Sequence, residues 1–497
     1  MQHHLLVSTR STVLYLATAS AVCCVTVAAV AQYPPAVVAV VIGLVLWFVA
    51  IKRTEPLSVI LLVASLMLMR PTWYGNGATP LGVPLAVAAA FFAASADHRE
   101  GRLVPSWRDR PRPVLAALCC LAAFQGWYLV LPILHGTYPA DFVLRSVTYV
   151  LVSVTAAAIV LREPLRARFI ARAVVWICGA IAASFGATLL LWAVSGPESH
   201  EILRMQLPGG ISGANGYAEG NDGQPLYLPW TLTNGATSAF GGITMPRLVG
   251  FMREPGLMAP MFIWAIYVAG RLKMRNTRLL QLLLFLGLLG CQSTAGFAIW
   301  VVLAVCTSVI GDAPQKKNFR VTRQFLGMAL LIGGVWLAIF APVWGLKAKE
   351  EINPGSISDR TTTAVTGITQ IDQHFWGAAP QGLENVGINL LSETHRIGGP
   401  GLLLALAAYF VPILVARRKS DAAKLIVPLA VTALVAQPVS GAPTWWILVL
   451  VAGALDDREH DRVPDETSAA EVDHAGTAGV VRLELTDPER SRAGLNF

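Results

Sequence analysis

The run AVVWICGAIAASFGATLLLWA, residues 173–193, decides the fold class of this chain. It is about as long as the roughly 20 apolar residues that a helix needs to cross a bilayer. It contains no Asp, Glu, Lys or Arg, and four arginines stand just before it, at Arg162, Arg166, Arg168 and Arg172. A basic connection followed by an uncharged apolar run is typical of a membrane-spanning helix that starts at the cytoplasmic face.

Similar runs recur along most of the chain. The 497 residues are 55% hydrophobic and 14% charged, with a mean hydropathy of +0.57, whereas soluble domains carry roughly 25% charged residues. The net charge of +8 comes from short basic runs between apolar stretches, a distribution that argues against nucleic-acid binding. The seven cysteines lie in or beside apolar stretches, so we expect them to be small core residues and not disulfides or metal ligands.

The apolar runs predict an all-α polytopic membrane protein with about 12–14 transmembrane helices. Every second connection is basic, so the positive-inside rule predicts an inner-membrane (plasma-membrane) protein with both termini in the cytoplasm. The first run ends in a sequence that mimics a signal-peptidase site, but its length favours a retained first span. The expected spans begin near Thr12, Pro35, Leu57, Leu81, Pro113, Phe142, Ala173, Leu257, Leu279, Ala295, Gln324, Gly399, Leu425 and Thr444.

Two connections are long, 196–256 and 346–398. Both are odd-numbered in the expected topology, which places them on the extracytoplasmic face. They belong to one transmembrane helical domain, 1–455. The remaining segment, 456–497, is rich in Asp and Glu and has few aromatic residues, so we expect a disordered cytoplasmic tail.

The first long loop closes with PRLVGFMREPG, residues 246–256. Arg247, Arg253 and Glu254 stand there at the expected membrane boundary, next to a helix N-terminus whose free amides favour an anion. The planar guanidinium group of arginine fits phosphate oxygens. The alternative is that the two arginines only reach toward lipid headgroups.

The second long loop supplies Arg360 and then NLLSETHRIGGPG, residues 389–401, at the start of a helix. His395 can exchange a proton near neutral pH, and Glu393 is an alternative base, as is Glu254 in the first loop. Arg396 adds a second cation to Arg360 for a phosphorylated substrate. Taken one at a time, these residues could equally be solvated loop side chains.

The order of these elements resembles the O-antigen ligase and O-antigen polymerase family. Members have about 12 membrane helices and a large extracytoplasmic loop, followed by an arginine with glycine three residues on and then proline before a helix. Arg247, Gly250 and Pro255 fit that element, and Ser293-Thr294-Ala295-Gly296 fits the serine-glycine element that follows it. In the second loop the family's order is reproduced by Arg360, Gly377, Gly382, Asn389, Gly398 and Gly401.

The chain also departs from that pattern. Ile388 stands before Asn389 where ligases of the family carry histidine, His395 comes seven residues later, and Thr294 replaces the arginine that commonly follows the serine. The missing His-Asn pair favours a polymerase over a ligase.

The resemblance implies a membrane glycosyltransferase without metal or cofactor. It would transfer a polyprenyl-diphosphate-linked saccharide to a hydroxyl of a glycan or lipid, in cell-surface polysaccharide biosynthesis. Membrane lipids would surround it, and a flippase or a chain-length regulator stays open as a partner. Under this hypothesis Arg247, Arg253, Arg360 and Arg396 bind the diphosphate, and His395, Glu393 or Glu254 acts as the base.

Two other classes remain to be weighed. Multi-span glycosyltransferases similar to the oligosaccharyl and mannosyl transferases place acids in the first extracytoplasmic loop, and Gln32-Tyr33-Pro34 has none. A lipid-linked oligosaccharide flippase or polysaccharide exporter is the non-enzyme alternative. It needs a cationic central cavity, for which the sequence offers Arg145 near the right depth.

Overall fold

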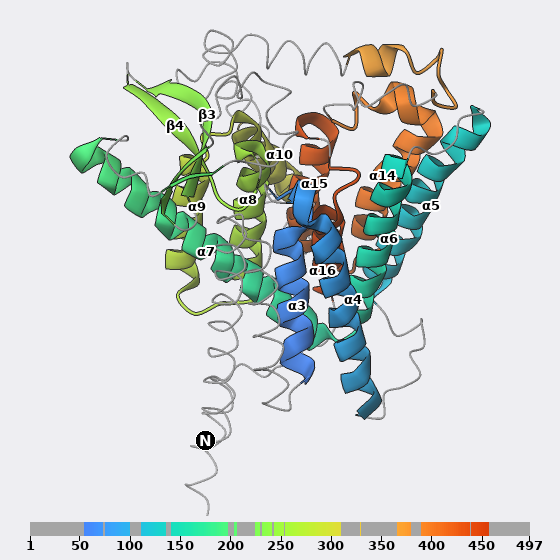
Figure 1. Ribbon diagram of the computed structural model, residues 1–497, viewed down its shortest axis with the longest axis horizontal. Coiled ribbons are helices and arrows are strands. Elements are labelled where there is room, and N and C mark those ends of the chain that lie inside the picture. The colour runs from blue at the N-terminus through green and yellow to red at the C-terminus, as the bar shows by residue number, and fades with distance from the viewer. Residues whose placement is uncertain are drawn as a thin grey trace, which may run out of the picture. The chain divides into compact units, whose positions relative to one another are not determined.

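The structure is a computed structural model of the whole chain, drawn in Figure 1. The residues that the structure describes are 54–72, 75–99, 111–135, 141–196, 203–205, 224–228, 231–240, 243–252, 254–309, 329, 365–378, 389–437 and 439–456. The spans expected near Thr12, Pro35 and Gln324, the tail after 456, and Arg253, Arg360 and Gly382 lie outside these residues.

The described residues are mostly helical, and every expected span among them coincides with a helix. Several of these helices begin at a proline in their first turn, where the missing amide proton would have had no helical partner. The helices are α3 (Thr54–Leu68), α4 (Gly75–Arg99), α5 (Arg112–Leu134), α6 (Asp141–Val160), α7 (Pro164–Ser195), α8 (Pro255–Arg271), α9 (Thr277–Gly290), α10 (Thr294–Val309), α14 (Thr394–Val415), α15 (Lys419–Val431) and α16 (Pro443–Ala454), with a π-helical turn, η3 (Thr432–Ala436), after α15.

Within the described ranges, five helical segments are long and apolar enough to cross a membrane: Thr79–Arg99, Arg112–Leu134, Val143–Val160, Pro164–Ser195 and Thr394–Val415. The shorter helix α9 also exposes apolar side chains. Leu279, Leu282 and Leu286 share one face and are 66%, 54% and 51% exposed. A large apolar stripe in contact with water would be unfavourable, so these helices suit a membrane protein.

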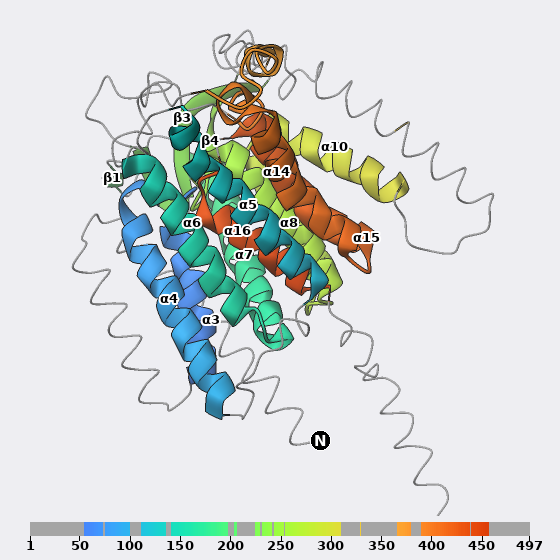
Figure 2. The ribbon, with the colours of Figure 1, turned by 90° about the vertical axis from the view of Figure 1, so that its right-hand side faces the viewer.

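The helices pack side by side, and several of the contacting pairs are distant in sequence. α3 lies along α4, α5 lies along α14, and α10 contacts α15. α8 packs between α7, α9 and α15, and α16 contacts α5, α6 and α7 (Figures 1 and 2). The core between them contains the largest fully buried side chains, including Trp264, Trp445 and Trp446.

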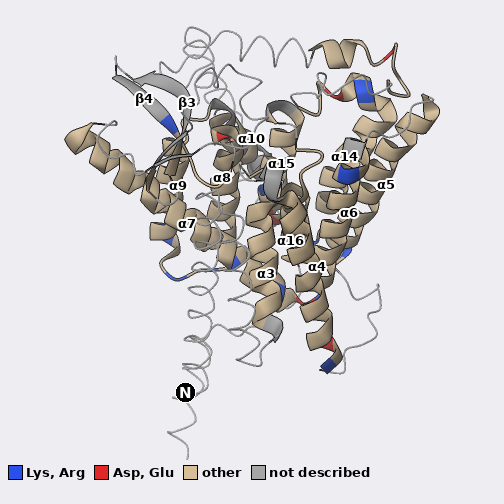
Figure 3. Ribbon diagram, in the orientation of Figure 1, with Lys and Arg blue, Asp and Glu red and all other residues tan. Residues whose placement is uncertain are grey.

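At one end of the bundle, arginines at or near helix ends form ion pairs with acidic residues; Figure 3 marks the basic and acidic residues along the ribbon. Arg166, before the apolar run of α7, lies 2.6 Å from Asp97 at the end of α4 and is only 1% exposed. Arg271, at the end of α8, pairs with Asp421 of α15. Asp456, after α16, accepts hydrogen bonds from the backbone amides of the α14–α15 connection. These contacts join helix ends that the basic connections of the sequence assign to the same side of the membrane.

The first long loop contains an antiparallel sheet that the sequence analysis did not anticipate. Its strand order is β1-β2-β3-β4. The sheet packs against α7, where Thr231 and Ser184 share a hydrogen bond of 2.7 Å and the rings of Tyr227 and Trp192 meet edge to face. Its strands are β1 (Leu203–Met205), β2 (Gln224–Leu228), β3 (Thr231–Phe240) and β4 (Ile243–Val249).

Candidate functional site

The site is built around the residues that precede α14. Asn389 and Ser392 close a tight turn, because the Asn389 Oδ1 atom accepts a hydrogen bond from the Ser392 amide at 2.8 Å. In return, the Ser392 Oγ atom accepts a hydrogen bond from the Asn389 amide at 2.9 Å. The next two amides, of Leu390 and Leu391, donate to backbone carbonyls of η3 at 2.9 and 3.2 Å. The turn is thus fixed both internally and against the end of α15.

This turn places Glu393 inside the protein. The side chain is 4% exposed, and its Oε2 atom accepts hydrogen bonds from the Tyr128 hydroxyl at 2.7 Å and the Ser440 hydroxyl at 3.0 Å. Burial raises the pKa of the Glu393 carboxyl above its ordinary value, while the Tyr128 bond, the Arg396 charge and the Ser440 bond oppose this. Glu393 is therefore a carboxyl group that holds its proton more tightly than a solvated one.

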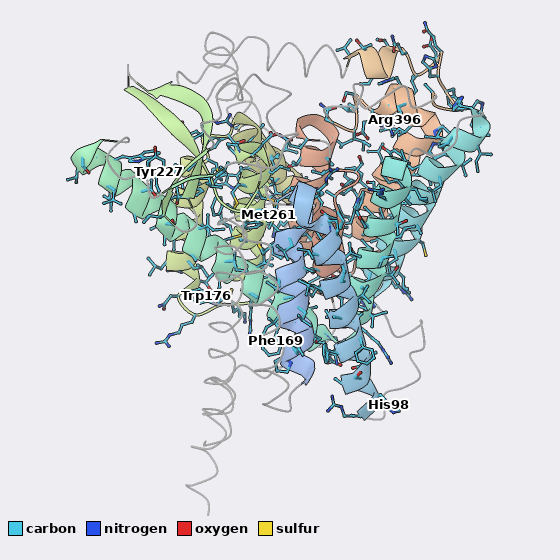
Figure 4. The ribbon with its side chains drawn as sticks, in the orientation of Figure 1. His98, Phe169, Trp176, Tyr227, Met261 and Arg396 are labelled. Carbon is cyan, nitrogen blue, oxygen red and sulfur yellow. The ribbon has the colours of Figure 1, made fainter. Side chains whose placement is uncertain are left out.

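Arg396 and His395 follow within the first turn of α14. The Arg396 guanidinium carbon lies 5.8 Å from the centre of the Tyr128 ring, a cation–π distance. Arg396 is labelled in Figure 4 near the start of α14. His395 is half-buried, and its Nδ1 atom lies 2.7 Å from the Ser392 carbonyl oxygen. The structure thus brings three of the predicted residues together: Glu393, His395 and Arg396.

Glu254 joins this group through the connection between η3 and α16. It directly precedes α8, and its Oε2 atom accepts a hydrogen bond from the Gln437 side-chain amide. Gln437 and Ser440 are three residues apart, so one short connection holds both predicted carboxylates, Glu254 and Glu393.

A break in α14 shapes the other side of the site. Gly398 has φ 68° and ψ −177°, a conformation that only glycine adopts readily. A Cβ atom at Gly398 would also collide with the Phe375 carbonyl oxygen. The break exposes backbone groups of α14, and segment 365–378 binds to them: the Ala378 amide donates to the Arg396 carbonyl at 3.1 Å, and the Gly399 amide donates to the Phe375 carbonyl at 2.9 Å.

Arg247 occupies a second region, on β4. It is half-buried, pairs across the sheet with Asn234 of β3, and lies close enough to Cys291 for its charge to act on the thiol. Cys291 lies two residues before Ser293 of the serine-glycine element, in which the Ser293 hydroxyl caps α10 by accepting a hydrogen bond from the Gly296 amide at 3.2 Å. Arg247 and the serine-glycine element, which begins 46 positions later at Ser293, therefore lie close together in the fold.

Gly250 allows β4 to pass close to α7. A Cβ atom at Gly250 would lie 2.7 Å from a methyl carbon of Ile181. The chain then runs from Arg247 through Gly250 to Glu254, so β4 connects the neighbourhood of Arg247 with the carboxylate pair.

Three important residues were missed by the sequence analysis: Tyr128, Gln437 and Ser440. The sequence contains a signal for Tyr128. Gln125 and Tyr128 are polar residues three positions apart on the apolar helix α5, where they share a face. Gln125 also points to this site, since its side-chain amide donates to the Ser440 carbonyl at 3.2 Å. Polar groups inside an apolar span are costly unless they are bonded, which makes such positions functional candidates.

Arg145, the cation that a flippase would need in a central cavity, is exposed on α6.

No family model, no curated protein and no solved structure matches this chain.

Proposed function

We propose that this protein is a membrane glycan polymerase or ligase that transfers a saccharide from a polyprenyl diphosphate carrier to a hydroxyl group on the extracytoplasmic face. The observation that carries this proposal is the pair of carboxylates, Glu254 and Glu393, held by one connection beside Arg396. A buried carboxyl, a neighbouring guanidinium group and lipid-facing helices are the parts that such a reaction requires.

In the proposed reaction, the acceptor hydroxyl gives its proton to a carboxylate. Its oxygen then bonds to the anomeric carbon, and polyprenyl diphosphate leaves with the electrons of the broken carbon–oxygen bond. The base must match the operating pH, and a carboxyl whose pKa is raised is a stronger base than a solvated one. We therefore assign the base to Glu393, with Glu254 second and His395 third.

The negative charge on the leaving diphosphate needs prepositioned cations. The charge of Arg396 acts on the Glu393 carboxyl, and the contact of Arg396 with the Tyr128 ring holds it beside the site. Arg247 is the second candidate, because its strand leads directly to Glu254. Arg253 and Arg360 remain proposed diphosphate ligands on sequence grounds.

The rival function, a flippase or exporter, would use charged groups lining a path through the bundle. Arg145 is exposed on α6, whereas the buried Glu393 accepts two hydroxyl hydrogen bonds, a placement that suits proton transfer. We therefore favour the transferase.

The test measures the lipid-linked glycans of a strain in which the native gene is deleted and a variant of the protein is expressed in its place. We expect Glu393→Gln and Arg396→Ala to leave single lipid-linked units on the outer leaflet, with turnover reduced on the order of 10²- to 10⁴-fold for loss of the base. Asp372→Asn is the matched control, since Asp372 is an exposed carboxylate in the same loop. Normal glycan in the Glu393→Gln strain at normal expression would remove the proposal, and units trapped on the cytoplasmic leaflet would indicate a flippase.

A further inference from the structure

Segment 365–378 presents an unusual set of exposed side chains. Phe375 and Trp376 are 51% and 62% exposed, and Val365 and Ile368 are 54% and 46% exposed. The last two are three residues apart in one helical turn, so they lie on the same face. Four large apolar side chains exposed within twelve residues indicate that something other than water covers this segment.

The segment is firmly attached to the helices below it. The Trp376 ring contacts the Trp127 ring of α5 at 6.4 Å between centroids, and a Cβ atom at Gly367 would collide with the Leu391 carbonyl oxygen. Both views show the segment lying across the end of α14 instead of continuing along it (Figures 1 and 2). Its exposed apolar side chains are therefore held in place by the fold.

The neighbouring surface is the lipid-facing end of a candidate span. Ile133 and Leu134, in the last turn of α5, are 75% and 54% exposed. A Cβ atom at Gly377 would lie 2.6 Å from Leu131, one turn earlier, so the segment meets α5 at this end. The apolar surface of the segment thus continues the apolar surface of the span.

The polar groups of the segment suit a boundary between lipid and water. The Thr369 hydroxyl donates to the Val365 carbonyl at 2.9 Å, so it needs no water. Asp372 and Gln373 are exposed at the turn between the two apolar pairs and can stay hydrated. Tryptophan is enriched at membrane interfaces, where its ring lies at headgroup depth.

We propose that segment 365–378 is a membrane-interface anchor, with its four exposed apolar side chains inserted into the headgroup–acyl boundary of the bilayer around the end of α5. The anchor is bonded to α14 through Arg396 and Gly399. Its depth therefore sets the depth of Arg396 and of the buried Glu393 beside it. This inference does not depend on which reaction the site performs.

The experiment places an environment-sensitive fluorescent amino acid at position 376, and separately at 368, in the full chain reconstituted into phosphatidylcholine nanodiscs. The matched control position is Gln373, in the same segment. Quenching is compared for lipids brominated near the headgroup end of the acyl chain, lipids brominated near its tip, and iodide in the water. Two labelled positions guard against a variant that does not assemble.

We expect bromines near the headgroup to quench positions 376 and 368 several-fold more than position 373, and iodide to quench position 373 most. Strong iodide quenching at all three positions would overturn the proposal, because the segment would then face water. Protection from both quenchers would also overturn it, because a protein partner would then cover the segment. Bromine quenching at 376 but not at 368 would contradict insertion of the whole segment.

Discussion

Replacing Glu393 by glutamine should change how the stability of this protein depends on pH. The Tyr128 and Ser440 hydroxyls both donate to the same oxygen, Oε2. A glutamine with its carbonyl oxygen in that position keeps both hydrogen bonds and resembles the protonated acid. Glu393→Gln is therefore a mimic of the neutral form of Glu393.

The sign of the effect follows from the raised pKa of Glu393. The folded state binds this proton more tightly than the unfolded state, so the stabilisation is fully present below the ordinary carboxyl pKa of 4.5. It is lost as the pH rises through the folded-state pKa. Between these two values the wild type loses at most about 1.4 kcal/mol per pH unit relative to the glutamine variant.

Glu393→Ala separates the hydrogen bonds from the charge. It removes the acceptor of two hydroxyls, which costs about 1–3 kcal/mol for each hydroxyl that stays buried. Tyr128 and Ser440 are only partly buried, so we expect the lower end of this range. Unlike the glutamine variant, the alanine variant should be less stable than the wild type even at acid pH.

The assay is the thermal midpoint of the three proteins in one detergent at a fixed scan rate, since membrane proteins often unfold irreversibly. We expect the wild type and Glu393→Gln to coincide at acid pH and to separate as the pH rises, with the glutamine variant more stable. A difference that stays constant with pH would refute the raised pKa. A glutamine variant as unstable as the alanine variant would refute the hydrogen-bond geometry.

Three further variants and one control variant test other parts of the structure by the same thermal midpoint. Gly398→Ala should lose about 1–3 kcal/mol from its backbone conformation alone, whereas Gly126→Ala, in a helix with no atom near the added methyl group, should lose nothing. Asp97→Asn should cost about 3–5 kcal/mol because it leaves the buried Arg166 without its carboxylate, and added salt should change this loss little. Gln437→Ala should cost about 1.5–3 kcal/mol by removing a donor to a carboxylate.

The helices could be predicted from the sequence because each depends on a local property. An apolar run of sufficient length with a basic or proline-containing boundary identified α5, α7, α8 and α16 before their packing was known. Which helix ends lie together at one end of the bundle was also predictable, because basic connections mark the ends that share one side of the membrane. The ion pair between Arg166 and Asp97 agrees with this grouping.

The sheet was missed although the sequence carries a hairpin signal. Phe240 pairs with Ile243, and Gly241-Gly242 stands between them in the sequence. A pair of glycines between two runs with β-branched residues is a recognised hairpin pattern. The many Gly, Asn and Pro residues earlier in the loop concealed it, because they are equally typical of irregular loops.

The site was predicted in part. Glu254, Glu393 and Arg396 were singled out because they stand at expected helix starts, which is a local feature. The partners that define their chemistry could not be found in this way, since Tyr128 and Glu393 are 265 positions apart. Their contact depends on how α5 packs against α14, and the break at Gly398 depends on the close approach of Phe375.

The two ends of the bundle hold their carboxylates in different ways, and this difference suggests where chemistry occurs. Asp97 is bonded to a charged partner, the Arg166 guanidinium group, at 2.6 Å. Glu393 instead accepts bonds from two neutral hydroxyls, and burial raises its pKa, so near neutral pH its two protonation states are closer in free energy than those of a solvated carboxyl. A group that must take up and release a proton needs that balance, whereas a group that orients a helix end does not. The end of the bundle that contains Glu393 is therefore the end where we expect proton transfer.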